Sequence, residues 1–255
     1  MRRIAPSPPA LDELLANVDA AFIQPHFQPI VDLRERRPIG YEVLSRGAFA
    51  SPQALFDRAR ELGVTWELER ACRLAALSRI AALSQEMRAS MLFFLNVDPD
   101  IFDDERFVRG FTLAFLREHG IDQTNIVIEI TERASVADYG RFEAVIRHYA
   151  SQGFSIALDD FGSGHSGLVT LISCVPNYLK LDMAVTRGID RGAYKQMILK
   201  SMVALAENIG AELIAEGVET WGELTTLVRY GVRYAQGFLL GRPQPLPEWS
   251  PIGRE

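Results

Sequence analysis

Eight short apolar runs, separated for the most part by longer stretches of helical pattern, constrain the fold of this 255-residue chain more than any other feature. The runs are rich in Val, Ile, Leu and Phe, as expected of strands that are buried on both faces. They are HFQPIVDL (26–33), PIGYEVL (38–44), MLFFLNV (91–97), NIVIEIT (125–131), FSIALDD (154–160), NYLKLD (177–182), AELIAEG (211–217) and RYAQGFL (233–239). Strands that alternate with helices form parallel βαβ units, and eight is the strand number of a closed barrel. The sequence therefore predicts an α/β protein of the (β/α)8 TIM-like barrel class.

The stretches between the later runs have the spacing of amphipathic helices. Apolar residues recur at steps of three and four in two of them, at Tyr139, Phe142, Ile146 and Tyr149 and at Ile198, Met202, Leu205 and Ile209. Gly153 and Gly210 follow at the points where these helices would end.

The first two runs depart from this alternation, because only the short segment RERRP separates Leu33 from Ile39. That spacing suits a hairpin, so we expect one antiparallel strand near the N-terminus of the barrel. We expect a single barrel domain over residues 21–245. An N-terminal tail with a possible capping helix would occupy residues 1–20, and a C-terminal tail residues 246–255.

The overall charge argues against a nucleic-acid polymer as the ligand. The formal net charge is -6, and Lys and Arg are not clustered as a polyanion-binding surface requires. No apolar run has the length of a signal peptide or a transmembrane helix. The two cysteines, Cys72 and Cys174, lie far apart, which predicts buried, reduced thiols in a cytoplasmic protein.

Each apolar run after the first carries a polar group near its C-terminal end. These groups are Glu42, Asn96, Glu129, Asp159, Asp160, Lys180, Glu216 and Gln236. Taken singly, a carboxylate could be a strand-end residue that meets solvent, the asparagine a turn residue, and the lysine a surface cation. In a (β/α)8 barrel, however, the C-terminal strand ends share one face, so we expect these groups to converge there.

The predicted donors are oxygen atoms of Glu, Asp and Asn, without His or Cys. Such donors favour hard ions, here Mg²⁺ or Mn²⁺, over zinc or copper. Two divalent ions that share carboxylates are suited to hydrolysis of a phosphodiester, which the pattern favours over glycoside hydrolysis.

The motifs together resemble the Glu-Ala-Leu (EAL) family of cyclic di-GMP phosphodiesterases. GYEVLSRG, FLNVDP, IVIEITE, ALDDFGSGHSGL, YLKLD, IAEGVET and AQGFLLGRP occur in the family's order. By this resemblance two Mg²⁺ or Mn²⁺ ions are bound by Glu42, Asn96, Glu129, Asp159, Asp160 and Glu216. Lys180 matches the residue that holds the attacking water near Asp160, so the implied catalytic groups are Lys180, Glu42, Asp160 and Glu216.

The resemblance also assigns residues outside the metal site. Gln28, Arg46 and Gln236 match substrate contacts, and the guanidinium of Arg46 suits a phosphate. Glu219 is expected to accept hydrogen bonds from the DFGSGHSG loop. Gly162 and Gly164 would give that loop its backbone freedom, and in the family this loop connects the site with a homodimer interface.

Several positions depart from the family pattern. Val43 replaces the signature Ala, His165 stands where Tyr or Phe is usual, Gly167 where Ser is frequent, and Asn177 where Asp is common. We expect Val43 to be tolerated, His165 and Gly167 to affect loop rigidity, and Asn177 to remove a charge near the site.

Three functions follow from these observations. The first is hydrolysis of cyclic di-GMP to linear pGpG. The second is a catalytically weak or inactive EAL-type receptor or protein-interaction module, and the third is a phosphodiesterase for another cyclic dinucleotide or for the linear product.

Overall fold

The chain forms a closed eight-stranded barrel in the strand order β1 to β8. The computed structural model describes residues 23–47, 51–131, 139–163, 171 and 175–250. The strands are β1 (Ile23–Asp32), β2 (Arg37–Gly47), β3 (Leu92–Asn96), β4 (Ile126–Thr131), β5 (Ser155–Phe161), β6 (Tyr178–Leu181), β7 (Glu212–Ala215) and β8 (Tyr234–Ala235). The predicted barrel class is thus confirmed.

The predicted hairpin is also confirmed. β1 pairs antiparallel with β2 and, on its other side, with β8, whereas all the other neighbouring strands are parallel. The eighth strand is shorter than its apolar run suggested, because the chain turns directly after Ala235. An isolated bridge between Phe27 and Gln244 brings the segment after β8 back to the first strand.

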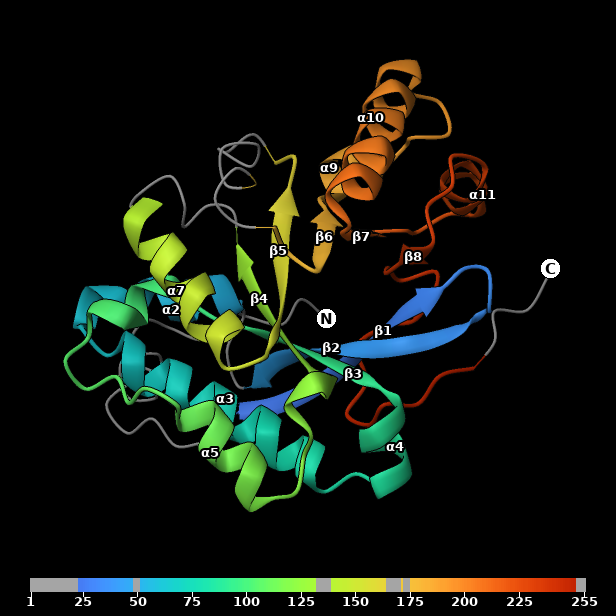
Figure 1. Cartoon of the computed structure of the whole chain (residues 1–255). Helices are drawn as coiled ribbons and strands as arrows, with labels where there is room; N and C mark the ends of the chain where they lie inside the picture. The colour runs from blue at the N-terminus through green and yellow to red at the C-terminus, as the bar shows by residue number, and fades with distance from the viewer. Residues whose placement is uncertain (1–22, 48–50, 132–138, 164–170, 172–174, 251–255) are drawn as a thin grey trace, which may run out of the picture.

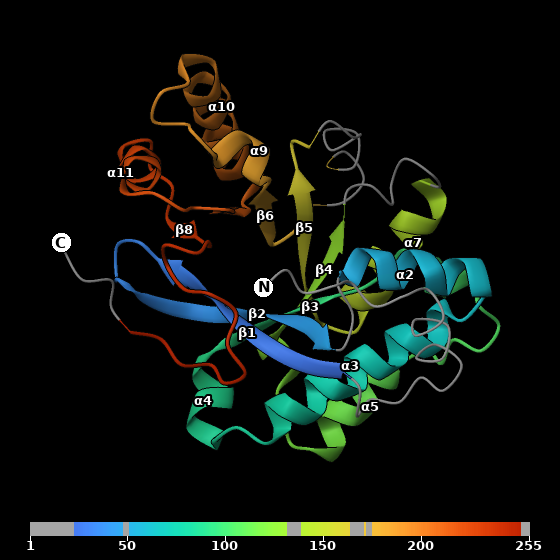
Figure 2. The same ribbon diagram turned by 180° about the vertical axis from the view of Figure 1, so that it is seen from behind.

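The helices lie on the outside of the barrel. They are α2 (Pro52–Leu62), α3 (Thr65–Ala81), α4 (Gln85–Ser90), α5 (Phe111–Glu118), α7 (Tyr139–Ser151), α9 (Met183–Thr186), α10 (Ala193–Ile209) and α11 (Trp221–Arg229), with short 3-10 turns η2 (Pro99–Asp103) and η3 (Gln123–Asn125). α3, α4 and α5 run along one side of the barrel and α9, α10 and α11 lie on the opposite side (Figure 1 and Figure 2).

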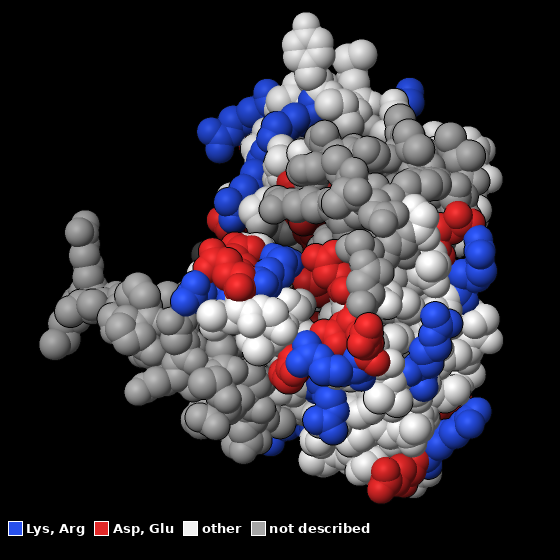
Figure 3. Space-filling view, turned by 90° about the vertical axis from the view of Figure 1, so that its left-hand side faces the viewer, with Lys and Arg blue, Asp and Glu red and all other residues white. Residues whose placement is uncertain are grey.

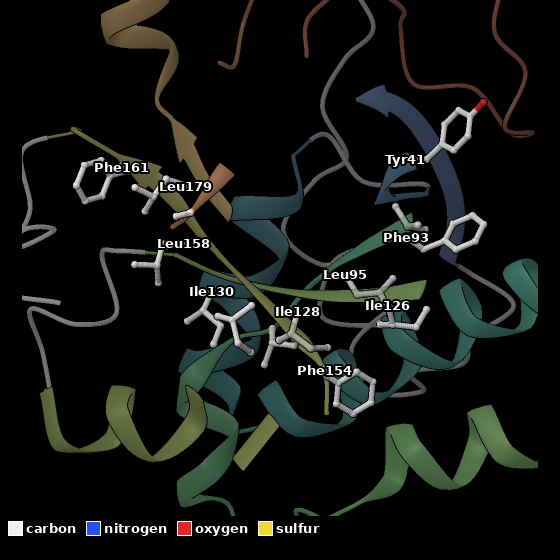
Figure 4. Packing of buried hydrophobic residues seen from close by; sticks show 14 of the residues in the cluster. Tyr41, Phe93, Leu95, Ile126, Ile128, Ile130, Phe154, Leu158, Phe161 and Leu179 are labelled. Carbon is white, nitrogen blue, oxygen red and sulfur yellow. The ribbon is translucent and has the colours of Figure 1, made fainter. Parts of the chain in front are cut away.

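Apolar side chains form two layers, because successive residues of a strand point to opposite faces. On β4, Ile126, Ile128 and Ile130 belong to the layer between strands and helices. Figure 4 shows part of this layer, including Ile128, Ile130 and Leu158. Val127 instead belongs to a small cluster inside the barrel.

The helix predictions hold in outline and fail in one detail. α7 and α10 form where predicted, and Gly210 ends α10 in a left-handed conformation. Of the predicted apolar stripe of α10, Met202, Leu205 and Ile209 pack against the core, whereas Ile198 is 47% exposed and the fully buried residues are Leu199 and Ala206. Apolar residues occur on several faces of α10, so periodicity alone did not exclude Ile198 from the packed face.

The predicted thiol and membrane properties can be compared only for the described residues. Cys72 is buried and free, and burial raises the pKa of its thiol to about 12, as expected of an unreactive core cysteine. Cys174 and the predicted capping helix lie outside the described residues. Within the described ranges, no helix combines the length and the apolar character needed to cross a bilayer.

Candidate functional site

The polar groups of the site lie one inward-facing position beyond the apolar residues that fill the barrel. Inside the barrel lie Ile30, Phe94, Val127, Ala157, Ile214 and Tyr234, with Tyr178 packed against them. On each parallel strand a polar residue lies two residues after the apolar one. These polar residues are Asn96, Glu129, Asp159, Lys180, Glu216 and Gln236. A two-residue step keeps the same face, so each strand presents an apolar residue to the core and a polar one to the mouth. On β1, which runs the other way, Gln28 precedes Ile30.

Lys180 is the centre of this cluster. Its ammonium Nζ lies 2.8 Å from Glu129 Oε1 and 2.8 Å from Glu216 Oε1, 3.1 Å from Asp159 Oδ1 and 3.4 Å from Glu42 Oε2. The Lys180 side chain is only 1% exposed. Four carboxylates around one ammonium leave a formal charge of −3 if all are ionised. The cluster therefore needs further positive charge or bound protons.

The pKa values reflect this excess of negative charge. Burial raises the pKa of Glu129 and of Glu216 well above its ordinary value, because Lys180 only partly offsets the desolvation of each carboxylate and the neighbouring carboxylates add to the rise. Burial opposes the charge on Lys180 as well, but Asp159, Glu129, Glu216 and Glu42 outweigh it and raise its pKa. Lys180 consequently stays protonated at neutral pH.

Within the described part of the chain, Glu42 accepts hydrogen bonds from two side-chain amides as well as from Lys180. Its Oε1 accepts from Asn96 Nδ2 at 3.1 Å, and its Oε2 accepts from Gln236 Nε2 at 2.7 Å. Burial would raise its pKa, but the charge of Lys180 and these hydrogen bonds outweigh burial and lower it. The Gln236 amide also donates to Gln28 Oε1 at 3.1 Å, so the predicted substrate contacts Gln28 and Gln236 adjoin Glu42.

Asp160 departs from regular strand geometry. Its φ is 58°, in the left-handed region, and the β5–β6 register shifts between Leu158 and Phe161. An irregularity of this kind re-aims side chains that would otherwise alternate between faces. Asp159, Asp160 and Glu216 can each offer one carboxylate oxygen within 4.8 Å of the other two. Two consecutive residues of β5 therefore contribute to the same site.

These residues fit divalent cations. In the described part of the chain, both carboxylate oxygens of Glu129 and Oδ1 of Asp159 are buried without a well-oriented hydrogen bond, although Lys180 Nζ lies near one oxygen of each. A buried carboxylate oxygen with this surplus acceptor capacity is suited to a cation. The oxygen donor set of Glu42, Asn96 and the acidic residues is the one predicted for Mg²⁺ or Mn²⁺.

A cavity of about 560 Å³ opens beside the cluster. Its lining includes Glu42, Asn96 and Asp160 and the predicted phosphate-binding residue Arg46. Figure 3, which faces the left-hand side of Figure 1, shows acidic side chains next to basic ones around a hollowed region.

The lining of this cavity also contains residues that the sequence pattern did not predict. Arg60, Glu69, Asp98 and Asp100 line it. Arg60 Nη2 donates to Asp98 Oδ2 at 2.7 Å. The position of Asp98 in the motif FLNVDP, two residues after Asn96, could have indicated that it lies near the site. Arg60 and Glu69 lie on helices, and no sequence motif indicated that they line the cavity.

The predicted loop residues are only partly described. Gly162 has a φ of 92°, which requires glycine-like freedom, whereas Gly164, His165 and Gly167 lie outside the described residues. Glu219 Oε1 accepts a hydrogen bond from Arg187 Nη2 at 2.5 Å. Its expected contact with the loop stays a prediction. Val43, the departure from Glu-Ala-Leu, is buried in the outer core layer.

The expectation for Asn177 is wrong. Asn177 is exposed and precedes β6, so it lies at the N-terminal end of the strand, away from the mouth. Its side-chain oxygen accepts from the backbone N–H of Ile156 at 2.9 Å. An Asn at this position therefore pairs β5 with β6 and does not change the charge of the site.

The chain is an α/β-barrel protein whose charged site, made of carboxylates and a lysine, lies at the C-terminal ends of the strands, where the active sites of such barrels are found. Comparison with known families assigns the chain within this class. The EAL domain family matches residues 11–243, and the chain belongs to that family.

Individual relatives agree with this assignment. A standalone versatile EAL protein from Vibrio cholerae O395, solved in a c-di-GMP bound form, is 32% identical with a TM-score of 0.80, covering 90% of this chain and 96% of that one. The BlrP1 protein of Klebsiella pneumoniae, in a manganese and cyclic di-GMP complex, is 28% identical with a TM-score of 0.80, covering 88% of this chain and 56% of that one.

The curated relatives are longer proteins. The "Probable cyclic di-GMP phosphodiesterase PdeI" of Escherichia coli K12 is 30% identical over 235 residues, which are 89% of this chain and 30% of that protein. A second E. coli relative, PdeD, is 28% identical over 87% of this chain and 42% of its own length. The chain thus spans less than half the length of these relatives.

Proposed function

We propose that this EAL domain is a phosphodiesterase that hydrolyses one phosphodiester bond of cyclic di-GMP and releases linear pGpG. The observation that carries the proposal is the buried cluster of Glu42, Glu129, Asp159 and Glu216 around Lys180, with Asp160 beside it. The names of the relatives support the choice of substrate.

Two Mg²⁺ or Mn²⁺ ions are proposed to bind at Glu42, Asn96, Glu129, Asp159, Asp160 and Glu216. When bound, such ions neutralise phosphate charge and lower the pKa of water, which provides a nucleophile near neutral pH. The protein would supply the preorganised positions of these oxygen donors.

The remaining roles belong to side chains of the chain itself. Lys180, protonated at neutral pH, would donate a hydrogen bond to the attacking water and orient it toward phosphorus. Arg46, at the cavity wall, would bind a phosphate oxygen through its guanidinium. Gln28 and Gln236 would hold the substrate beside Glu42, to which Gln236 already donates.

The direct test is to incubate the purified protein with cyclic di-GMP and Mg²⁺ or Mn²⁺, with EDTA in a parallel sample, and to separate the products by chromatography. We expect metal-dependent formation of pGpG. Binding of the nucleotide without product would identify a receptor instead. Absence of both turnover and binding would point to a protein-interaction role.

The assay has matched variants. Glu42→Gln keeps the size of the side chain and removes one carboxylate from the cluster, so we expect turnover to be lost. Glu61→Gln makes the same chemical change on the exposed side of α2, where Glu61 pairs with Arg58, and should leave turnover unchanged.

A further inference from the structure

Two buried glutamines connect Glu42 with the place where the barrel closes. Gln236 Nε2 donates to Glu42 Oε2 at 2.7 Å and to Gln28 Oε1 at 3.1 Å. Gln28 Nε2 in turn donates to the backbone carbonyl oxygen of Gly241 at 3.2 Å. Gln28 is 8% exposed and Gln236 is 4% exposed, so both amides are largely withdrawn from water. We call this chain of hydrogen bonds, from Gly241 through Gln28 and Gln236 to Glu42, the glutamine relay.

The hydrogen bonds of the relay agree on one orientation of each amide. An ionised carboxylate and a backbone carbonyl can only accept, so Gln236 turns its NH₂ group toward Glu42 and Gln28 turns its NH₂ group toward Gly241. The oxygen of Gln28 then faces Gln236, which has a second N–H to donate. A flip of the Gln236 amide would place its oxygen 2.7 Å from Glu42 Oε2, where two acceptors repel each other. The relay therefore has a defined direction.

The Gly241 end of the relay is held by backbone contacts. The segment after β8 runs back along β1, where Phe27 and Gln244 exchange two backbone hydrogen bonds of 2.7 and 3.0 Å (Figure 1 and Figure 2). A Cβ at Gly241 would lie 2.4 Å from Cγ of Pro29, the neighbour of Gln28. The absence of a side chain at position 241 therefore lets this backbone lie against β1, where its carbonyl oxygen meets Gln28.

The other end of the relay acts on the Glu42 carboxylate. Oε2 of Glu42 accepts from Gln236, and Oε1 accepts from Asn96 Nδ2 at 3.1 Å, so an amide holds each oxygen. Lys180 Nζ lies further from Oε2, at 3.4 Å. Each oxygen can accept more than one bond, and the two amides determine which directions are left for a cation. Without the Gln236 amide, we expect the ammonium of Lys180 to draw Oε2 toward itself.

We propose that Gln236 and Gln28 are positioning residues, which aim Glu42 at the proposed ion site and make its orientation depend on closure of the barrel. The inference rests on the proposed function, because it takes Glu42 as a ligand of a divalent ion. It adds a task to the substrate contacts proposed for the two glutamines. The buried Oε1 of Gln236, which has no hydrogen-bond partner in the described part of the chain, can still accept from a ligand.

A role in substrate contact alone makes a different prediction. Loss of such a contact would raise KM for cyclic di-GMP and leave the affinity for the ion unchanged when no nucleotide is present. Loss of the relay would weaken ion binding in the nucleotide-free protein. Because Gln28 acts through Gln236, the effects of the two substitutions should also be non-additive, whereas two independent contacts would contribute separately.

Four full-length variants test the proposal. Gln236→Met and Gln28→Met, alone and together, keep unbranched side chains and remove the amides of the relay. Gln196→Met is the matched control, because the Gln196 amide also joins separate segments: it donates to the carbonyl of Ile189 at 2.8 Å and accepts from Tyr230 Oη at 3.0 Å. Each variant is compared with the unmodified chain by thermal unfolding in EDTA, by nucleotide-free Mn²⁺ binding followed with EPR of the free ion, and by kcat and KM.

We expect Gln236→Met to bind Mn²⁺ about 10-fold more weakly, the lower end of the range for residues that orient metal ligands. Gln28→Met should bind it at least about threefold more weakly, and the double variant should stay within about twofold of Gln236→Met. Gln196→Met should lose stability in EDTA and keep the Mn²⁺ affinity of the unmodified chain. Folded relay variants with unchanged Mn²⁺ affinity, or with losses that multiply in the double variant, would overturn the proposal.

A failure of Gln236→Met to fold leaves Gln28→Met to decide. This variant retains Glu42 and both of its amide donors, so only an effect passed on through Gln236 can weaken ion binding. A folded Gln28→Met with unchanged Mn²⁺ affinity would therefore overturn the relay by itself, even if its KM for cyclic di-GMP were raised.

The nucleotide-free Mn²⁺ measurement separates this inference from the proposed function. An unmodified chain that binds Mn²⁺ but releases no pGpG would refute the proposed hydrolysis, and the relay could still be tested in that protein. An unmodified chain that does not bind Mn²⁺ would overturn both.

Discussion

Asp160 illustrates how one backbone angle shapes the site. With a φ of 58°, it brings a second carboxylate of β5 toward the mouth, next to Asp159 and Glu216. Asn and Asp tolerate the left-handed region better than other residues that carry a Cβ, because their short polar side chains can hydrogen-bond locally. An aspartate at this position therefore tolerates the left-handed backbone conformation and also supplies a carboxylate to the candidate ion site.

Two substitutions at Asp160 should separate these roles. Asp160→Asn keeps a residue that tolerates the left-handed region, whereas Asp160→Ala adds strain of about 1–2 kcal/mol. We expect both variants to lose turnover, and only the Ala variant to unfold at distinctly lower denaturant concentration. Urea unfolding in EDTA, which removes metal effects, measures the difference. Equal stability of the two variants would argue against backbone strain at this residue.

Lys180 offers a second test at the residue scale. Lys180→Met preserves much of the volume and removes the ammonium that faces four carboxylates. We expect kcat to fall by about 10²- to 10⁴-fold, the range for loss of a group that assists proton transfer. Lys200→Met, on the exposed face of α10, is the control and should retain full activity. A Lys180→Met variant with near-normal kcat would remove Lys180 from the mechanism.

At the scale of elements, close approach of β2 and β3 positions Glu42 relative to Asn96. Gly40 pairs with Leu92, and a Cβ at Gly40 would lie 2.2 Å from the Leu92 carbonyl oxygen. The contact involves backbone on both strands, so no side-chain rotation can relieve it. A glycine at position 40 is therefore required by the distance between the strands and not by an unusual dihedral angle.

Gly40→Ala should consequently separate the two strands. We expect a loss of about 1–3 kcal/mol of unfolding free energy or more, as for overpacking of a core, and weaker Mn²⁺ binding because Glu42 and Asn96 move apart. Gly192→Ala is the control, since its Cβ would meet only the flexible Lys195 side chain at 3.3 Å. Chemical denaturation of both variants tests this, and equal stability would contradict the expectation.

The same elements explain what the sequence could predict. The eight strands and the hairpin were predictable because periodicity and loop length are local properties of the chain. The strand-end groups from Glu42 to Gln236 could be placed at one mouth because a barrel aligns its C-terminal strand ends. The ion pairs of these groups with Lys180 could not be predicted, because they depend on distances between strands that a local sequence pattern does not specify.

Other features depended on contacts between distant segments. The exposure of Ile198 on α10, the role of Asn177 and the presence of Arg60 and Glu69 in the cavity lining all depend on which elements pack together. Glu69 is two residues from Glu67 on the same helix, and only tertiary packing makes one buried and the other partly exposed. Sequence periodicity gave no reason to distinguish them.

At the scale of the whole molecule, the site couples stability to pH. The pKa of Glu129 and of Glu216 is raised in the folded protein, mainly by burial, above the unfolded value of 4.5. The folded chain therefore binds protons that the unfolded chain releases above about pH 4.5. Their contribution to stability is complete below that pH and is lost as pH rises through the folded pKa values. The pKa of Glu42 is lowered in the folded protein, so its contribution to stability is lost as pH falls, and this loss occurs below about pH 4.5.

We therefore expect the metal-free protein to lose stability as pH rises from 5 to 8, and Mn²⁺ to restore more of it at higher pH, because ion binding requires ionised carboxylates. Thermal unfolding across this range, with EDTA and with Mn²⁺, measures both effects. Glu129→Gln, which cannot ionise, should flatten the EDTA profile. An EDTA profile that rises with pH would contradict the assignment of raised pKa values to this cluster.

The closure of the barrel joins segments that the ribosome makes at very different times. β1 pairs with β8, Phe27 bridges to Gln244, and Gln28 donates to the Gly241 carbonyl, 213 positions later in the chain. Gln28 and Gln236 therefore cannot meet until almost the whole domain has been translated. Until β8 has been translated, β1 lacks one of its neighbouring strands. The acidic residues of the nascent chain then also lack Gln236, which donates to Glu42 in the complete domain. The site is completed by the final residues of the domain, so a product truncated before them would lack both a sealed barrel and Gln236.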